Sequence, residues 1–383
     1  MKIYYKNWRL FLIFLFLFLS IAAIVSRMVY VQVEQGNFLL QKGNNQNTSE
    51  RVIKFKRGSI YDKNGIPLAI SITGFDLFAL SGLSEDDFLK IKNTLKLNDL
   101  EYKPFNKKSL IKNSLSFEEM RKVRSLRIDR LELEKTYKRH YPLGEQVAPL
   151  VGFSGRDGYG LEGLEKSYNS ILTGKPLKER VLRDGARSTI QRLEVLEFGE
   201  NSKDIYLTID SNIQYIAYKY LVEAIKNNDG TGGTVIILDN SAKEVLALAS
   251  YPSYNPNNPM RSIKKNRAFL ESYEPGSIVK PLALAGAIEK DLIDIDTELE
   301  LPIKIEVDGN IINDRKKYGQ LKAYEIIKES SQVGATQISF LLGAERLIDN
   351  YKKFGFSKPV NINFPSTSFG EINSRDEISD IEI

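Results

Sequence analysis

The longest apolar run in the sequence lies near its N-terminus. Residues 10–25 (LFLIFLFLFLSIAAIV) form sixteen consecutive positions without a charge. As a helix this run covers about 24 Å, which is short of a hydrocarbon core of about 30 Å, so flanking residues such as Trp8 and Met28 are needed to span it. The pattern predicts a transmembrane helix over residues 10–33. A cleaved signal peptide is the alternative, but no clear A-x-A site follows the run.

The charges around this run predict its orientation. Lys2, Lys6 and Arg9 precede it, whereas only Arg27 follows closely. Because cations accumulate on the cytoplasmic side of membrane helices, residues 1–9 are expected to form a cytoplasmic tail. Everything after about residue 34 then lies on the far side of the membrane.

Residues 34–201 mix short strand-like runs with helical segments. The polar residues 34–50 suit a juxtamembrane linker. Ser84 with Asp87, and Ser116 with Glu119, predict two helix N-termini, the second as a capping box. The whole stretch therefore predicts an α+β domain in which helices are inserted among strands.

A second domain is predicted from residue 202 onward. The alternating segment IYLTID predicts a strand, and GTVIILD and EVLALAS predict two more, joined by a turn at residues 240–243. Between the first and the second of these strands a helix begins at Ser211, and its apolar positions are expected to share one buried face. These positions are Ile213, Ile216, Ala217, Tyr220, Leu221 and Ala224.

Composition narrows the available chemistry. The chain has 383 residues, of which 42% are hydrophobic, enough for two or three domains with cores. It has no cysteine and a single histidine, which argues against disulfides, thiol nucleophiles, zinc clusters and a Ser-His-Asp triad. The 54 basic and 49 acidic side chains are well mixed, so the net charge of +5 indicates a solvated surface and not a nucleic-acid interface.

Serine followed three residues later by lysine occurs three times, and one occurrence has a distinct context. The pairs at 109/112 and 262/265 lie in charged surroundings, whereas Ser277 and Lys280 open an apolar segment (EPGSIVKPLALAGAIE). Residues three apart share a helix face, and burial would lower the pKa of Lys280, giving a neutral amine able to take the Ser277 proton. The alternative is that Ser277 caps a core helix while Lys280 extends to solvent.

The segment EPGSIVKP resembles the active-serine segment of penicillin-binding proteins, the serine D,D-transpeptidases that cross-link peptidoglycan. RGSIYDKNGIPLA (57–69), YPLGEQVAPLVGF (141–153) and GLEGLEKSYNSILTGKP (160–176) resemble the pedestal of the class B members. LTIDSNIQ (207–214) and PSYNPNNP (252–259) are similar to the entry of their transpeptidase domain. NRAFLESYEPGS is more similar to the cell-division branch than to the elongation branch.

The resemblance implies an α+β fold with three parts after the cytoplasmic tail. A transmembrane anchor (10–33) precedes a pedestal domain of the dimerisation type (34–201) and a partial transpeptidase domain (202–383), an antiparallel sheet with helices. Ser277 would be the acylated nucleophile and Lys280 its proton acceptor. In the family's second motif, Ser-x-Asn, Ser330 would relay a proton, and Gln332 stands where asparagine is expected. The extra methylene displaces the orienting amide by on the order of 1 Å, a distance that matters for catalysis.

The family's third motif, Lys-Thr/Ser-Gly, does not occur in these residues. It supplies the strand that binds substrate and a second oxyanion donor, a contribution of about 2.7 to 4 kcal/mol in other acyl-transfer enzymes. The sequence therefore predicts an incomplete transpeptidase domain, from a longer or disrupted gene or from a degenerate member. Two rival functions stay open. One is a non-catalytic, membrane-anchored division scaffold; the other, against which the pedestal argues, is a β-lactamase or β-lactam sensor.

The resemblance also implies a setting and partners. The chain would act in septal cell-wall cross-linking, with peptidoglycan stem peptides as substrate and β-lactams bound covalently through Ser277. It would sit as a single-pass protein in a bacterial inner membrane with most of its residues periplasmic, beside other division and cell-wall synthesis proteins. No metal, organic cofactor or nucleic acid is implied.

Overall fold

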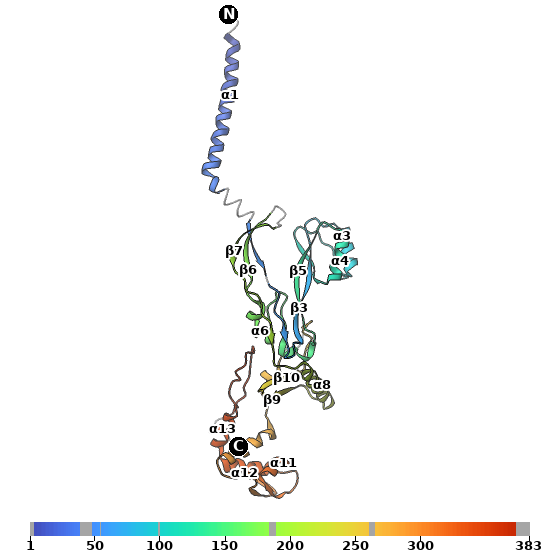
Figure 1. Cartoon of the computed structure of the whole chain (residues 1–383), viewed down its shortest axis with the longest axis vertical. Coiled ribbons are helices and arrows are strands. Elements are labelled where there is room, and N and C mark those ends of the chain that lie inside the picture. The colour runs from blue at the N-terminus through green and yellow to red at the C-terminus, as the bar shows by residue number, and fades with distance from the viewer. Residues whose placement is uncertain are drawn as a thin grey trace. The chain divides into compact units, whose positions relative to one another are not determined.

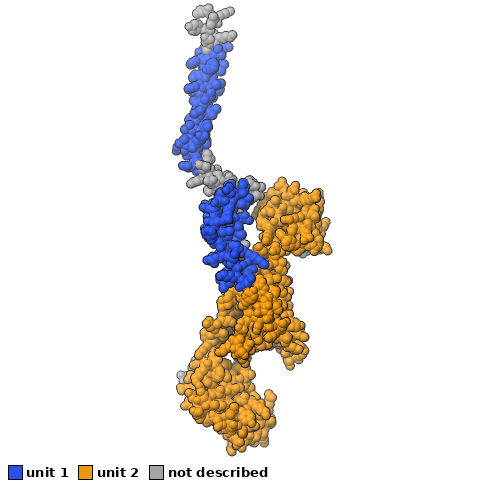
Figure 2. Space-filling view, viewed as in Figure 1, with its two compact units in different colours: residues 1–58, 170–204 blue, residues 59–169, 205–383 orange. Residues whose placement is uncertain are grey.

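The computed structural model describes residues 4–38, 48–53, 55–98, 100–183, 189–259 and 265–372. The chain divides into two compact units, which Figure 2 colours separately. Unit 1 comprises residues 1–58 and 170–204, and unit 2 comprises residues 59–169 and 205–383. Helices alternate with mainly antiparallel strands, which confirms the predicted α+β class.

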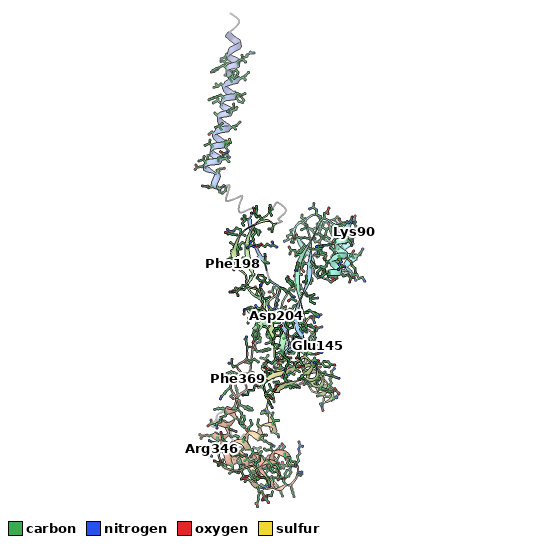
Figure 3. The ribbon with its side chains drawn as sticks, viewed as in Figure 1. Lys90, Glu145, Phe198, Asp204, Arg346 and Phe369 are labelled. Atoms are coloured by element: carbon green, nitrogen blue, oxygen red, sulfur yellow. The ribbon has the colours of Figure 1, made fainter. Side chains whose placement is uncertain are left out.

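A long N-terminal helix, α1 (Tyr4–Val29), exposes its apolar side chains and continues into a π-helical turn, η1 (Tyr30–Glu34). Within the described residues, Trp8–Glu34 is the one stretch long and apolar enough to cross a membrane, and none of its most apolar window is buried. Figure 3 shows side chains projecting from α1. Phe16 on this helix is 73% exposed. So much exposed apolar surface needs lipid, so α1 fits the single-pass anchor predicted over residues 10–33.

Unit 1 contains a three-stranded antiparallel sheet of order β1-β6-β7, with bounds β1 (Thr48–Ile53), β6 (Leu177–Arg183) and β7 (Thr189–Glu197). Its central strand carries Glu179, which is 4% exposed. Arg51 lies 3.7 Å and Arg192 3.4 Å from this carboxylate. The two cations compensate a charge that would otherwise be costly to bury.

Unit 2 begins with a sheet of order β4-β3-β2-β8, in which β5 also pairs with β3. The bounds are β2 (Ile60–Tyr61), β3 (Pro67–Ala79), β4 (Ser109–Leu115), β5 (Leu131–His140) and β8 (Ile205–Tyr206). The β3–β5 pairing runs from Ile70 opposite His140 to Ala79 opposite Leu131. The strand predicted from IYLTID is shorter than expected, because its parallel partner β2 offers only two residues for pairing.

Two helices cover one part of this sheet, α3 (Glu85–Leu95) and α4 (Phe117–Ser125), and they lie together in Figure 1. Both predicted N-caps are confirmed. The Ser84 hydroxyl accepts from the Asp87 amide at 3.2 Å, and Ser116 with Glu119 forms the complete capping box. The apolar sides of the two helices pack into one core with the sheet, around residues such as the fully buried Phe88.

A buried aspartate, Asp62, joins the turn after β2 to a helix much later in the chain, α8 (Ser211–Asn227). Its carboxylate accepts from the amides of Asn64 (2.8 Å) and Ile66 (2.7 Å), and from the amide (3.0 Å) and hydroxyl (2.7 Å) of Ser211. Burial raises the pKa of Asp62, but these hydrogen bonds together hold its pKa below the ordinary value. Asp62 thus anchors the turn after β2, while Arg57 donates to Thr173 within unit 1.

Helix α8 packs on the hairpin of β9 (Gly233–Asp239) and β10 (Glu244–Tyr251), whose bounds match the prediction. The predicted buried face of α8 is partly wrong, since Ile216 is 51% and Tyr220 60% exposed, and Ala224 is exposed as well. The helix is rotated because the fully buried Gln214 exchanges two hydrogen bonds with the Leu248 backbone. The buried stripe is instead Ser211, Gln214, Ala217, Leu221 and Ile225.

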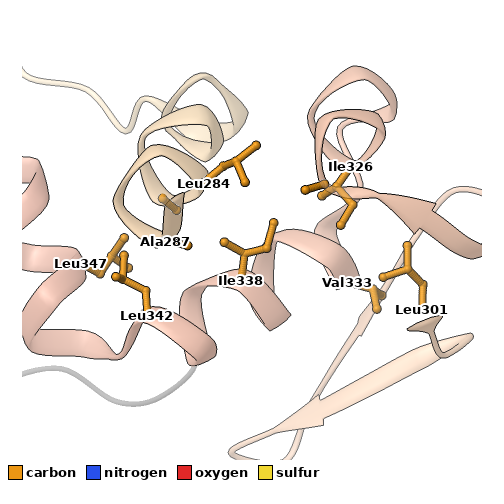
Figure 4. Close-up of a cluster of buried hydrophobic side chains, with 10 residues drawn as sticks. Leu284, Ala287, Leu301, Ile326, Val333, Ile338, Leu342 and Leu347 are labelled. Atoms are coloured by element: carbon orange, nitrogen blue, oxygen red, sulfur yellow. The ribbon is translucent and has the colours of Figure 1, made fainter. Parts of the chain in front are cut away.

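The last part of unit 2 is a helical cluster with two small two-stranded sheets. Its helices are α10 (Lys280–Glu289), α11 (Ala323–Glu329), α12 (Gln332–Leu342) and α13 (Ala344–Lys353). Its strands are β11 (Glu298–Leu301), β12 (Lys304–Val307), β13 (Asn310–Asn313) and β14 (Gly319–Lys322), paired as β11-β14 and β12-β13. Figure 4 shows its core, in which Leu284 and Ala287 of α10 meet Ile338 and Leu342 of α12. This packing fixes α10 against the α11–α12 corner.

The remaining elements are short. They are η2 (Gly144–Gln146), α5 (Ala148–Val151), α6 (Gly163–Ser167), α7 (Asn169–Thr173), α9 (Arg267–Leu270) and the 3₁₀ turn η3 (Gly276–Val279), which leads directly into α10.

Candidate active site

Ser277 lies on the 3₁₀ turn η3, just before α10. Gly276 ahead of it has a φ of +61°, a left-handed conformation that glycine adopts at little cost. The Ser277 carbonyl accepts from the Lys280 amide, and the Ser277 side chain is exposed. Since side chains three apart nearly eclipse on a 3₁₀ turn, Ser277 and Lys280 share one face. In the described part of the chain the Ser277 hydroxyl makes no hydrogen bond, so it is open to a reactant.

Lys280 is the first residue of α10, and its amine points toward the corner between α11 and α12. The Nζ atom donates to the carbonyl oxygen of Ser330 at 2.8 Å, to its hydroxyl at 3.3 Å and to the carbonyl oxygen of Ser331 at 3.3 Å. The described contacts of this amine are therefore to the second motif, and none of them is to the Ser277 hydroxyl. Three acceptors around one amine match the three donors of an ammonium group.

The pKa of Lys280 is shifted by two opposing effects. Burial of the amine lowers the pKa and is the larger effect, whereas the negative charge of Asp314 raises it. The balance is a pKa below the ordinary value for lysine. The amine is therefore easier to deprotonate than a surface lysine, as a proton acceptor requires.

The α11–α12 corner is built by two adjacent serines. Ser330 ends α11 in a left-handed conformation, with φ 55° and ψ 38°. Ser331 begins α12, and its hydroxyl accepts from the Gly334 amide at 2.9 Å. Gly334 lets the helices approach closely, because a Cβ there would lie 2.7 Å from an Ile326 side-chain carbon. Gln332, the residue in the asparagine position, is exposed.

Asp314, one residue beyond β13, is a site residue that sequence reasoning missed. One carboxylate oxygen accepts from the Ser331 hydroxyl at 2.7 Å, and the other accepts from the amides of Gln332 (2.5 Å) and Val333 (3.3 Å). A carboxylate at the N-terminus of α12 is favoured by the helix dipole. No local pattern links Asp314 to the serine corner, because the two segments are separated in sequence by β14 and α11.

The other Ser-x-x-Lys pairs have structural roles. Lys112 forms an ion pair with Glu119 at 2.7 Å, and Lys265 forms one with Glu271 at 2.9 Å. Ser262 lies outside the described residues. The Ser253-Tyr254-Asn255 segment is in a loop, where Ser253 donates to the Glu145 carbonyl at 2.6 Å. Across the described residues, no three histidine, cysteine, aspartate or glutamate side chains are grouped in a way that could hold a metal ion.

A Ser-x-x-Lys turn that faces a serine corner is typical of serine acyl-transferases of the penicillin-binding type. The family model described as "Penicillin-binding Protein dimerisation domain" matches residues 52–207. The model described as "Penicillin binding protein transpeptidase domain" matches residues 233–382.

Curated relatives agree with these matches. The chain is 33% identical to the "Probable peptidoglycan D,D-transpeptidase PenA" of Neisseria gonorrhoeae, over 95% of this chain and 65% of that protein. It is 30% identical to the "Peptidoglycan D,D-transpeptidase FtsI" of Buchnera aphidicola subsp. Schizaphis graminum, over 100% of this chain and 70% of that protein. The FtsI of Escherichia coli K12 is 28% identical, over 98% and 66% respectively. The chain therefore belongs to the class B penicillin-binding proteins, and it spans 65% of the length of PenA.

Solved structures share the fold. Penicillin-binding protein PBP2, solved in complex with MreC from Helicobacter pylori, has a TM-score of 0.67 and 23% identity, over 85% of this chain and 68% of that chain. Penicillin Binding Protein 2X from Streptococcus thermophilus has a TM-score of 0.66 and 22% identity, over 85% and 55%. These similarities show that the fold is that of class B penicillin-binding proteins.

Proposed function

We propose that this chain carries the acylation machinery of a peptidoglycan D,D-transpeptidase. In this reaction the Ser277 hydroxyl attacks the carbonyl carbon of the penultimate D-alanine of a stem peptide. The Ser277 proton passes to Lys280, an ester forms, and the terminal D-alanine leaves with a proton on its amine. An amine of a neighbouring strand then displaces Ser277 and completes the cross-link.

The observation that carries this proposal is the position of the Lys280 amine. It is partly buried, has a lowered pKa, and lies on the same turn as Ser277 while donating to Ser330. To take the Ser277 proton, the amine must be neutral and must turn from its present acceptors toward Ser277. Ser330 is proposed to relay the proton to the leaving amine. Gln332 is proposed to orient the substrate, with its amide displaced by about 1 Å relative to the family's asparagine.

A labelled penicillin tests the nucleophile. The full chain in detergent is incubated with a fluorescent penicillin, and the modified residue is located by mass spectrometry. The expected result is one adduct, on Ser277, which disappears in Ser277→Ala. Ser109→Ala is the matched control, because Ser109 also precedes a lysine by three residues, and it is expected to keep the label. A wild-type chain that stays unlabelled would overturn the proposal.

The cellular setting is proposed from the same family membership. The cations before the apolar run 10–25 favour a cytoplasmic N-terminus, with the pedestal (34–201) and transpeptidase (202–383) regions outside the bacterial inner membrane. Because the chain has no cysteine, single introduced cysteines report topology cleanly. Lys290→Cys is expected to react with an impermeant maleimide in spheroplasts, and Lys6→Cys only after the membrane is opened. The reverse pattern would contradict this orientation.

Septal synthesis is the proposed process, with other division and cell-wall synthesis proteins as partners. The relatives named FtsI and the division-type segment before Ser277 support it. A non-catalytic scaffold, in which the anchor and pedestal bind division partners, is the second candidate. The two are separated by complementation of a division-deficient strain. If Ser277→Ala supports division and a deletion of residues 51–200 does not, the scaffold function is correct.

A further inference from the structure

Asp314 connects three parts of the candidate site that are distant in sequence. It follows β13, its two oxygens bind the first turn of α12, and its charge acts on the amine at the start of α10. Its three donors are the hydroxyl of Ser331 and the amides of Gln332 and Val333. Thus one partly buried side chain restrains the first turn of α12, which begins at Ser331 directly after Ser330.

The restrained corner presents the acceptors of Lys280. Ser330 is held in a left-handed conformation, which is strained for a residue with a Cβ, so its geometry depends on the contacts around it. The Ser331 hydroxyl both donates to Asp314 and accepts from Gly334, which fixes the start of α12. The carbonyl oxygens of Ser330 and Ser331 then point at the Lys280 amine.

The charges around Lys280 leave Asp314 as the carboxylate that acts on it. No residue of η3 or α12 carries a charge. On α11, Glu325 accepts from the Lys322 amide, Lys328 is exposed, and Glu329 binds Lys316 at 2.9 Å and Tyr318 at 3.3 Å. On α10 the other charged residue is Glu289, at the opposite end, where it pairs with Lys353.

We propose that Asp314 is a positioning residue for acyl transfer. It holds the corner of Ser330 and Ser331 so that their oxygens face Lys280, and it supplies the negative charge that opposes deprotonation of this amine. The inference rests on the proposed acylation of Ser277. Asp314 makes none of its described hydrogen bonds to Ser277 or Lys280, so it would act through the serine corner and through its charge.

The test measures acylation of the full chain by a fluorescent penicillin, separating the rate at saturation from the binding constant, over a range of pH. Asp314→Ala is expected to lower the saturating rate by about 10- to 100-fold, because the corner is released and a displacement of the order of 1 Å can cost about 100-fold. Asp314→Asn keeps most of the shape and is expected to lose less than about 10-fold. Removing the charge lowers the pKa of Lys280, so the acid limb of the pH–rate profile moves to lower pH in Asp314→Asn.

Asp296→Asn is the matched control, since Asp296 is an exposed carboxylate of the same cluster that pairs with Lys322 at 3.3 Å. It is expected to leave both the rate and the acid limb unchanged. Asp314→Glu restores the charge and is expected to return the acid limb to its wild-type position. Should Asp314→Ala fail to fold, the shift in Asp314→Asn decides, because a purely structural role would leave that limb in place.

The outcomes separate the two proposals. If the wild-type chain acylates at Ser277 and Asp314→Asn has an unchanged acid limb with an unchanged rate, the inference about Asp314 is wrong and the proposed function stands. If the wild-type chain is not labelled at Ser277, the proposed function fails, and the role of Asp314 fails with it.

Discussion

The carboxylates of Asp62 and Asp314 accept similar hydrogen bonds in different surroundings. Each accepts a serine hydroxyl at 2.7 Å and at least one amide from the first turn of a helix, α8 for Asp62 and α12 for Asp314. Asp62 is fully buried, and its described donors are neutral groups of fixed position. Asp314 is partly exposed and also acts on the charge of Lys280. The comparison separates a carboxylate that stabilises a fold from one whose neighbour changes its protonation state.

Among variants of the candidate site, Lys280→Ala is expected to have the largest effect on the acylation rate. Acylation by labelled penicillin is expected to fall by about 100-fold or more, because the proton acceptor is removed. The unfolding midpoint, followed by circular dichroism, is expected to change little, since the amine is partly exposed. A rate within about 3-fold of wild type would exclude Lys280 as the general base.

Asp62→Ala is expected to have the largest effect on the free energy of unfolding. It leaves the amides of Asn64, Ile66 and Ser211 without their acceptor in a buried position, at a cost of about 3 kcal/mol in the free energy of unfolding. Urea denaturation followed by circular dichroism measures this loss. Asp349→Ala, at an exposed position of α13, is the control and is expected to stay within about 0.5 kcal/mol of wild type. Equal stabilities of the two variants would contradict the anchoring role.

The pH dependence of stability sharpens the comparison. Because the pKa of Asp62 is lower in the folded chain than its usual value of about 3.9, its contribution to stability is present above that pH. The contribution is lost as the pH falls through the lower folded value. Asp62→Asn should therefore flatten the acid part of the stability curve measured by urea denaturation from pH 7 to pH 2. Parallel curves for the two chains would show that Asp62 is not the group responsible.

Ser330→Gly is expected to separate stability from chemistry at one residue. Glycine relieves the left-handed strain, so the free energy of unfolding is expected to rise by about 0.5–1 kcal/mol. The acylation rate is expected to fall by about 10-fold, because the hydroxyl that meets Lys280 is lost. Ser330→Ala is the control that loses the hydroxyl and keeps the strain, so it should show the same rate without the gain in stability.

Gln332→Asn is expected to have the smallest effect. It shortens an exposed side chain to the length usual in the family, so the acylation rate is expected to rise by about 2- to 5-fold with no change in stability. Steady-state labelling at several penicillin concentrations measures this change. A lower rate would indicate that the glutamine amide is already adapted to its substrate.

Local signals predicted the elements that depend on neighbours in sequence. The caps at Ser84 and Ser116, the hairpin of β9 and β10 and the apolar helix α1 were all correct, because hydrogen bonds within a few residues or simple periodicity decide them. The buried face of α8 was partly wrong. Periodicity assigned Ile216 and Tyr220 to the interior, whereas two hydrogen bonds exchanged between Gln214 and the Leu248 backbone set the rotation of the helix.

In the candidate site, too, the sequence predicted some features and only the structure showed others. Motif spacing and family resemblance selected Ser277, Lys280, Ser330 and Gln332, and their catalytic roles stay predictions. The amine of Lys280 donates to Ser330 and Ser331. These acceptors lie on another helix corner, so no spacing rule in the sequence contains them.

The sequence by itself determined the apolar anchor, the two serine N-caps, the β9–β10 hairpin and the serine and lysine available for acyl transfer, since each depends on residue type and short-range periodicity. The tertiary structure alone decided which acceptors surround the Lys280 amine and that Asp314 holds the corner carrying them. The reason is that the pKa of a lysine depends on its burial and on charges within a few ångströms, and folding brings those groups together from segments that the sequence keeps apart.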